Sequence, residues 1–211
     1  MHTPDENNDH RGTDVTAILL AAGRSRRMGR PKQLLPLRGE DTVIEVVASR
    51  LRPHVMELVV VVGHVGGQVA AMLADQDVIL AINDNVDAGM LSSVQAGVRA
   101  ADPRSRGYLI CLGDQPSLQT PVIEAVLQGA AGGGGIVIPT YGGKRGHPVF
   151  IHRRYREEIL ALDPVTTGLN VLTRGHREDT VEIVLRDALI LDDMDTPDDY
   201  AREFERAEMT N

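Results

Sequence analysis

The chain has 211 residues, which is enough for one domain with a full hydrophobic core, and no linker rich in serine or proline divides it. Its 22 Lys and Arg residues against 30 Asp and Glu residues give a net charge of −8, which disfavours a nucleic-acid-binding surface because such surfaces neutralise phosphates with basic side chains. A single cysteine excludes a disulfide framework and a cluster of thiol ligands, and no apolar run reaches the roughly 18 residues of a membrane span.

The first 14 residues are polar and lack the apolar segment of a secretory signal. We therefore expect residues 1–14 to form a disordered tail, residues 15–211 to form one domain, and the protein to be cytoplasmic. The cysteine, Cys111, lies in the apolar run YLICL and is expected to be a buried strand residue rather than a reactive thiol.

Strand and helix patterns alternate along the rest of the chain. Apolar runs predict strands that begin at Ala17 and then cover residues 57–63, 78–83, 108–112, 136–139, 147–151, 181–185 and 189–191. Helical patterns cover residues 43–51, 66–73, 90–101, 120–128, 153–162, 169–173 and 197–208, and the first and last of them have threonine N-caps. The alternation predicts an α/β fold with a Rossmann-like, mostly parallel mixed sheet and helices on both faces.

The segment that follows the first predicted strand concentrates positive charge. Small residues at Ala21, Ala22 and Gly23 leave the backbone N–H groups accessible, and five basic residues follow within nine positions (Arg24, Arg26, Arg27, Arg30 and Lys32). Such a loop is suited to a polyphosphate, although it matches neither GxGxxG nor GxxxxGK[ST]. The alternative is a solvated basic turn after a core strand.

The string LAAGRSRRMGRPK, residues 20–32, resembles the LAAGxSxRMGxxK signature of nucleotidyltransferases, in particular the molybdenum cofactor cytidylyltransferase group of the MobA-like family. The resemblance implies a fold like that of nucleotide-diphospho-sugar transferases. It also implies that the loop wraps the triphosphate of a bound nucleotide through Leu20, Ala21, Ala22, Gly23, Ser25 and Lys32. In the family, the residues matched by Arg27 and Lys32 neutralise charge that develops at the α-phosphate during catalysis.

A second segment, NDNVDAGMLSSVQAG at residues 83–97, resembles the G-M-x-x-S segment with which the family contacts base and ribose. The resemblance implies nucleotide contacts from Gly89, Ser92 and Ser93. By itself the pattern indicates only the start of a helix, capped by Asp87 or Ser92.

Asp114 stands at the end of the predicted strand 108–112, in the string LGDQP. A hard cation such as Mg²⁺ prefers oxygen ligands and typically takes one or two protein carboxylates together with phosphate oxygens, and Asp114 is placed to supply one. The alternative is a turn aspartate that caps the next helix. The resemblance implies that Asp114 is catalytic and binds the metal that bridges the nucleotide phosphates.

A cluster of five aspartates lies in the string ILDDMDTPDDY at residues 190–200. Asp198 and Asp199 belong to a first helical turn, where the helix dipole stabilises negative charge. Asp195 precedes the Thr-Pro helix start, and the segment resembles the D-x-D-T-P-E-D-Y ending of the cytidylyltransferase group, with Asp193 at its other D position. The resemblance implies that Asp195 is a second carboxylate at the metal.

The string GGKRGHPVF, residues 142–150, carries an R-G-H-P that the family places beside the pterin substrate. The resemblance implies that Arg145 and His147 bind the terminal phosphate of that substrate, whereas the residues alone indicate a core or turn histidine. Between residues 162 and 176 the chain departs from the G-D-x-G-A-R-like segment of the family, which affects the pterin side more than the nucleotide side.

The resemblance, which covers roughly residues 16–200, implies a Mg²⁺-dependent enzyme that joins CTP and a molybdopterin-type cofactor, with a molybdoenzyme or its chaperone receiving the product. One rival is a guanylyl or sugar-1-phosphate transferase, and Ala22 separates the two groups because the guanylyl group has LAGG instead of LAAG. The other rival is a non-catalytic nucleotide-binding or cofactor-binding protein, which would not need Asp195.

Overall fold

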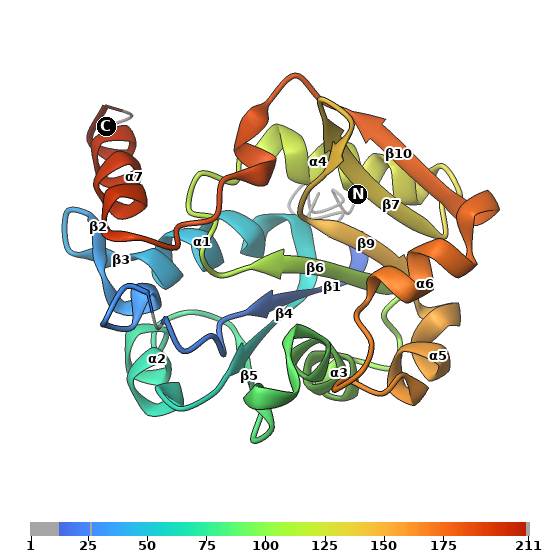
Figure 1. Ribbon diagram of the computed structural model, residues 1–211, viewed down its shortest axis with the longest axis horizontal. Coiled ribbons are helices and arrows are strands. Elements are labelled where there is room, and N and C mark those ends of the chain that lie inside the picture. The colour runs from blue at the N-terminus through green and yellow to red at the C-terminus, as the bar shows by residue number, and fades with distance from the viewer. Residues whose placement is uncertain (1–12, 26, 210–211) are drawn as a thin grey trace, which may run out of the picture.

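The computed structural model describes residues 13–25 and 27–209 of the chain (Figure 1). Residues 1–12, where the sequence predicts a disordered tail, lie outside the described residues. The last two positions of the predicted tail, 13 and 14, belong to the first strand instead. Asp14 is held there because its carbonyl accepts the backbone N–H of Arg106 at 2.6 Å and its carboxylate accepts the Arg106 Nε at 2.8 Å.

The described strands form one large mixed sheet and a separate small hairpin. The order across the large sheet is β10-β7-β9-β6-β1-β4-β5, with β8 paired to β7 at one end. Its strands are β1 (Thr13–Leu20), β4 (Val55–Val62), β5 (Ile79–Ile82), β6 (Gly107–Leu112), β7 (Ile136–Tyr141), β8 (Lys144–Arg145), β9 (Val149–His152) and β10 (Thr180–Val184). The hairpin consists of β2 (Pro36–Arg38) and β3 (Asp41–Thr42).

Most strand pairs in the large sheet are parallel, which confirms the predicted fold class. β1 pairs in parallel with β4 and β6, β4 with β5, and β7 with β10. β9 runs antiparallel to β6 and β7. The carboxyl ends of β1, β4, β5 and β6 therefore meet at one edge of the sheet, and the start of β9 lies at that same edge because its direction is reversed.

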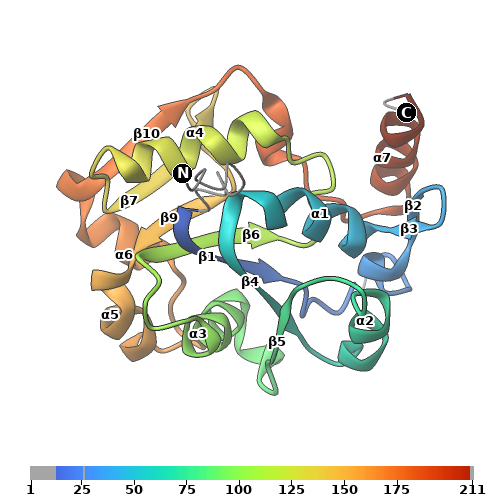
Figure 2. The ribbon, with the colours of Figure 1, turned by 180° about the vertical axis from the view of Figure 1, so that it is seen from behind.

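Helices cover both faces of the sheet (Figures 1 and 2). One face is covered by α1 (Val43–Leu51), α2 (Gly66–Met72) and α4 (Thr120–Ala131), and the other by α3 (Met90–Ala100), α5 (Arg156–Ala161) and α6 (Asn170–Gly175). The run of valines in β4 serves both layers, since Val60 packs in the first core cluster and Val59 and Val61 pack in the second. Alternating strand side chains point to opposite faces, so a strand covered on both sides is apolar throughout.

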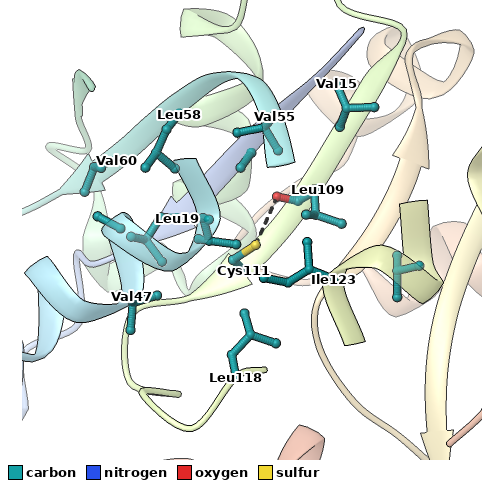
Figure 3. Close-up of a cluster of buried hydrophobic side chains, with 14 of the residues drawn as sticks. Val15, Leu19, Val47, Val55, Leu58, Val60, Leu109, Cys111, Leu118 and Ile123 are labelled. Atoms are coloured by element: carbon teal, nitrogen blue, oxygen red, sulfur yellow. Dashed lines mark hydrogen bonds between the residues drawn. The ribbon is translucent and has the colours of Figure 1, made fainter. Parts of the chain in front are cut away.

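Cys111 lies in the first of these clusters, on β6, and is fully buried (Figure 3). Its Sγ donates to the carbonyl of Leu109 at 3.5 Å, and burial raises the pKa of the thiol. The expectation of a buried, unreactive cysteine is consistent with this environment.

A third, smaller apolar cluster lies beside the loop that follows β1. It joins Met28 of that loop, Leu37 of β2 and Val46 of α1 to Met194, with Tyr200 of the final helix α7 (Pro197–Met209) packed against it. The cluster therefore ties the C-terminal segment to the region that follows the first strand (Figures 1 and 2).

Two predicted strands are wrong in detail. Residues 189–191, predicted as a strand, belong to a 3₁₀ helix, η6 (Ala188–Leu191), because the Asp187 side chain accepts the Leu189 N–H at 2.9 Å and starts a helical turn. The strand predicted from residue 147 begins at Val149, because Pro148 has no N–H to donate to a ladder. His147 thus lies in the bend before β9.

Short 3₁₀ turns complete the described structure: η1 (Lys32–Leu34), η2 (Arg52–His54), η3 (Val86–Ala88), η4 (Arg153–Tyr155) and η5 (Arg177–Asp179). None of the helices in the described part of the chain is both long and apolar enough to cross a membrane.

Candidate active site

The basic loop leaves the sheet at the carboxyl end of β1 and is held by its own polar groups. Ala21 still donates its N–H to the carbonyl of Val61, at 2.8 Å. Ser25 then adopts a left-handed backbone conformation, with φ 49°, and its hydroxyl accepts the backbone N–H of Lys32 at 3.1 Å. The loop therefore folds back on itself and brings Lys32 to the end of the strand from which it left.

Lys32 joins two carboxylates from distant parts of the chain. Its Nζ donates to Asp114 Oδ2 and to Asp195 Oδ1, the second at 3.0 Å. The other oxygen of Asp195 accepts Arg27 Nη1 at 2.7 Å. The four residues that the sequence assigns to catalysis and metal binding are thus linked in one chain of contacts.

Lys32 is nearly buried, with 7% of its surface exposed. Burial by itself lowers the pKa of an ammonium group, but Asp114 and Asp195 outweigh that effect, so the pKa of Lys32 lies above its ordinary value. Lys32 is therefore fully charged at neutral pH.

Asp114 is placed by the close approach of two adjacent strand ends. The residue before it, Gly113, donates its N–H to the carbonyl of Leu20 at 3.0 Å. A Cβ on Gly113 would lie 2.9 Å from that same carbonyl oxygen, so only glycine allows β6 to end so near β1. This contact sets Asp114 beside the basic loop.

Asp195 is placed by the segment between η6 and α7. The N–H of Met194 donates to the Asp114 carbonyl at 2.9 Å, which joins the two acidic segments through their backbones. The Asp199 carboxylate then accepts the N–H groups of Asp195 and Thr196, at 3.0 and 2.7 Å. Thr196 in turn accepts the Asp199 N–H at 3.2 Å, which completes a reciprocal capping box at the start of α7.

A polar cavity of about 440 Å³ opens in front of these residues. Its wall is formed by Leu20, Gly23, Arg24, Ser25, Arg27, Lys32, Gln33, Val86, Asp87, Asp114 and Asp195. Arg24 reaches across it to form an ion pair with Asp87 on η3. Each described basic residue of the loop that lines the cavity is therefore paired with a carboxylate on its wall.

The nucleotide contacts predicted for Gly89, Ser92 and Ser93 lie beside this cavity but not in its wall. Asn83 Nδ2 donates to both serine hydroxyls, at 2.8 and 2.9 Å, and Ser92 donates to the Gly89 carbonyl at 2.7 Å. Ser92 lines a second cavity of about 710 Å³ next to β5 and α3. The two serines therefore shape the turn into α3.

The side chains of the two residues predicted for acceptor binding lie in different surroundings. His147 lies near Asp114 because the reversed direction of β9 brings its start to the end of β6, and the pKa of His147 is lowered by burial while the Asp114 charge acts against that shift. Arg145, in contrast, points toward β10 and forms an ion pair with Glu182 at 2.6 Å. Only His147 belongs to the neighbourhood of Asp114.

The carboxylate pair suits a hard divalent cation. Asp114 and Asp195 direct one oxygen each at a single positive centre, the Lys32 ammonium, and Mg²⁺ prefers oxygen ligands of this kind. No group of three or more histidine, cysteine or acidic side chains in the described part of the chain is arranged to hold a metal. Mg²⁺ sites in nucleotide enzymes typically combine one or two protein carboxylates with phosphate oxygens.

Three residues that support the site were not predicted from the sequence. Gln33 is buried beneath the loop, and Gln115 Nε2 donates to Asp193 at 2.9 Å. Burial and then the Asp114 charge raise the pKa of Asp193. Asp199 could have been predicted, because an aspartate three residues after a threonine has the spacing of a capping box. No comparable sequence pattern marks Gln33 or Gln115.

Residues 17–181 match the family described as the MobA-like NTP transferase domain. The chain belongs to this family. Asp195 lies beyond the matched residues, and the contact with Lys32 is what joins it to them. The predicted family resemblance is therefore confirmed, and the protein is a nucleotidyltransferase of the MobA-like type.

Curated relatives cover most of the chain. Molybdenum cofactor cytidylyltransferase of Escherichia coli (strain K12) is 27% identical over 193 residues, which are 91% of this chain and 96% of that protein. Nicotine blue oxidoreductase of Paenarthrobacter nicotinovorans is 32% identical over 168 residues, or 76% of this chain and 81% of that protein. Relatives at this level of identity are therefore named for different activities.

Solved structures agree with the fold. The crystal structure of an Rv0371c homologue from Mycobacterium sp. strain JC1 has a TM-score of 0.82 and 29% identity, covering 94% of this chain and 98% of that one. The structure of Rv0371c from Mycobacterium tuberculosis H37Rv in complex with manganese has a TM-score of 0.76 and 27% identity, covering 90% and 98%.

Proposed function

We propose that this nucleotidyltransferase moves CMP from CTP to the terminal phosphate of a molybdopterin-type cofactor and releases pyrophosphate. The observation that carries the proposal is the convergence of Asp114 and Asp195 on Lys32 at the wall of a polar cavity. The choice of substrates rests on the LAAG string at residues 20–23 and on the cytidylyltransferase relative, which shares 27% identity over most of the chain.

The reaction is a displacement at the α-phosphorus. An oxygen of the acceptor phosphate forms a bond to that phosphorus, and the bond from phosphorus to the oxygen that bridges the α- and β-phosphates breaks. Pyrophosphate leaves with the bonding electrons. The acceptor phosphate is already anionic near neutral pH, so the step needs positioning and charge neutralisation rather than a general base.

Lys32 and Arg27 supply the positive charge that this step requires. Lys32 is held charged and nearly buried, where an electrostatic interaction is worth more than in bulk water. Arg27 is much more exposed and lies on the outer oxygen of Asp195. Substrate phosphates are expected to replace the carboxylates as the partners of these two cations.

Asp114 and Asp195 are proposed to hold Mg²⁺ once Lys32 turns to the phosphates. The ion would neutralise phosphate oxygens and align the triphosphate for in-line attack. Two features support this assignment: the oxygen-only ligand pair, and the manganese complex of a structural neighbour that is 27% identical.

On the acceptor side, we propose that His147 contacts the incoming phosphate, because it lies nearest to Asp114 among the residues predicted for that role. Arg145 would first have to leave Glu182. Base recognition is proposed for the turn around Gly89, which borders the cavity through the preceding residues Val86 and Asp87.

The deciding experiment measures pyrophosphate release from CTP and from GTP, with molybdopterin as acceptor and with Mg²⁺ present. Release with CTP in excess of GTP is expected. Equal or greater release with GTP would reject the cytidylyl assignment but keep the transferase class, whereas nucleotide binding without any release would favour a binding protein.

A further inference from the structure

Gln33 lies beneath the basic loop, and its side chain is almost completely buried, with 2% of the residue exposed. Its amide Nε2 donates to the carbonyl of Ala21 at 3.2 Å and, over a longer distance of 3.5 Å, to the carbonyl of Gly23. Its Oε1 accepts the Ser25 hydroxyl at 3.4 Å. One side chain thus contacts three alternate residues of the loop from the inside.

These contacts fix the direction of two peptide groups. In a trans peptide the C=O and the following N–H point in opposite directions. Because the carbonyls of Ala21 and Gly23 are turned inward to Gln33, the N–H groups of Ala22 and Arg24 are turned away from it. Neither N–H group is found to donate to a backbone carbonyl among the described residues.

The same side chain connects the loop to Lys32. Ser25, which donates to Gln33, also accepts the backbone N–H of Lys32, at 3.1 Å. Gln33 is the next residue along η1. The peptide groups of the loop and the backbone that carries the central cation are therefore held by one buried hydrogen-bond network.

We propose that Gln33 is a positioning residue that pre-organises the loop amides for the phosphates of the nucleotide. This inference rests on the proposed function, since it assumes that the loop binds a polyphosphate. Gln33 acts through the backbone of the loop: it holds inward the carbonyls that would otherwise repel phosphate, and so presents N–H groups to it.

A buried glutamine whose amide is hydrogen-bonded also contributes to the stability of the fold, so the test needs a second buried glutamine that donates to two carbonyls elsewhere in the protein. Gln95 is 4% exposed, and its Nε2 donates to the carbonyls of Ile159 and Leu162, at 2.9 and 2.8 Å. Gln33→Leu and Gln95→Leu each remove an amide that satisfies two carbonyls. Comparable losses of melting temperature are therefore expected for both variants.

Calorimetric titration with inorganic tripolyphosphate and with CTP, both with Mg²⁺, separates the two variants. We expect Gln33→Leu to bind both ligands about tenfold or more weakly, since hydrogen bonds to a charged group are involved. KM for CTP should rise by a similar factor with a smaller change in kcat, because these contacts are made before the transition state. Gln95→Leu should bind both ligands as the parent does.

Gln33→Glu provides a second variant of the same shape in which the amide donor is lost, and it should also bind tripolyphosphate weakly. It replaces Gln33→Leu in the comparison if that variant does not fold. Parent-like tripolyphosphate binding by the Gln33 variants, or an equal loss in Gln95→Leu, would overturn the positioning role. Absence of tripolyphosphate and CTP binding by the parent protein would overturn the proposed function itself.

Discussion

Lys32 is the shared cation of Asp114 and Asp195. Its removal should therefore affect the stability of the protein and the rate of catalysis in different ways. In Lys32→Ala, Asp114 and Asp195 lose their shared cation and repel each other. We expect turnover to fall by orders of magnitude, because a cation that stabilises the transition state is typically worth about 3 to 4 kcal/mol. Steady-state pyrophosphate release checks this expectation.

The same variant gives a test of the metal site that does not depend on activity. With Lys32 replaced, the carboxylate pair is unneutralised, so Mg²⁺ should raise the melting temperature of Lys32→Ala more than that of the parent. Arg52→Ala, which breaks an exposed ion pair with Asp77, is the control and should respond as the parent does. Equal Mg²⁺ effects in all three proteins would argue against a metal held by these two acids.

The aspartates near the start of α7 should differ in their roles although they share one charge. We expect Asp195→Asn to melt near the parent temperature and to lose most activity, whereas Asp198→Asn should remain active. Asp199→Asn should lose both stability and activity, because the Asp199 carboxylate accepts the Asp195 N–H and caps the helix. Melting curves and steady-state rates for the three variants test this order, and full activity in Asp195→Asn would place that residue among the structural acids.

Residues that match a motif at a strand end were predictable from the sequence, and those that support them were not. Asp114 and Lys32 each lie in a recognisable string at an element boundary, and the structure brings them into contact. Gln33 is one of many polar residues in the sequence, and its role depends on the folding of the loop over it. The sequence grouped Asp199 with Asp198 because both lie in the first turn, and only the hydrogen bonds separate them.

At the scale of elements, α7 is held to the site by its first turn. Asp199 accepts hydrogen bonds from the Thr196 hydroxyl and from the Thr196 and Asp195 N–H groups, and these contacts lower the pKa of Asp199 to about 2. A carboxylate whose pKa is lower in the folded than in the unfolded protein stabilises the fold above its unfolded pKa of about 3.9. That stabilisation is lost as the pH falls toward 2.

The effect of Asp199→Asn on stability should therefore depend on pH. At pH 7 we expect the free energy of unfolding of this variant to be about 1 kcal/mol lower than that of the parent, which is the usual contribution of a helix cap. The difference should shrink between pH 4 and pH 2, where the parent carboxylate itself becomes protonated. Urea unfolding at a series of pH values measures it, and a difference that stays constant down to pH 2 would contradict the role of the ionised cap.

Elements with long periodic patterns were predicted well, and short ones were not. The four valines of β4 and the capped helix α1 follow patterns that extend over several residues. The residues 189–191 form a three-residue apolar run in which a strand and a 3₁₀ turn have the same pattern, and the side chain of Asp187 decides between them. The antiparallel insertion of β9 was also not predictable, because strand order depends on contacts between distant segments.

At the scale of the whole molecule, CTP binding should increase the free energy of unfolding, because a ligand that binds only the folded protein stabilises it. At a CTP concentration about 100 times its dissociation constant, the gain is about 2.7 kcal/mol. For a chain of 211 residues this corresponds to a rise in melting temperature of roughly 5 to 10 °C. Thermal melts with Mg²⁺ and CTP should show it, with a smaller rise for GTP, and the reverse order would count against cytidine selectivity.

During translation, the basic loop leaves the ribosome well before the last carboxylate that contacts it. Asp195 follows Lys32 by 163 positions, an interval of roughly 8 to 30 s at ordinary rates of synthesis. Throughout that time the growing chain contains Lys32 and, later, Asp114. It cannot yet form the backbone contact from Met194 to Asp114 or the cap of α7. The contacts around Lys32 are therefore completed only when the C-terminal segment has been made, after every strand of the large sheet.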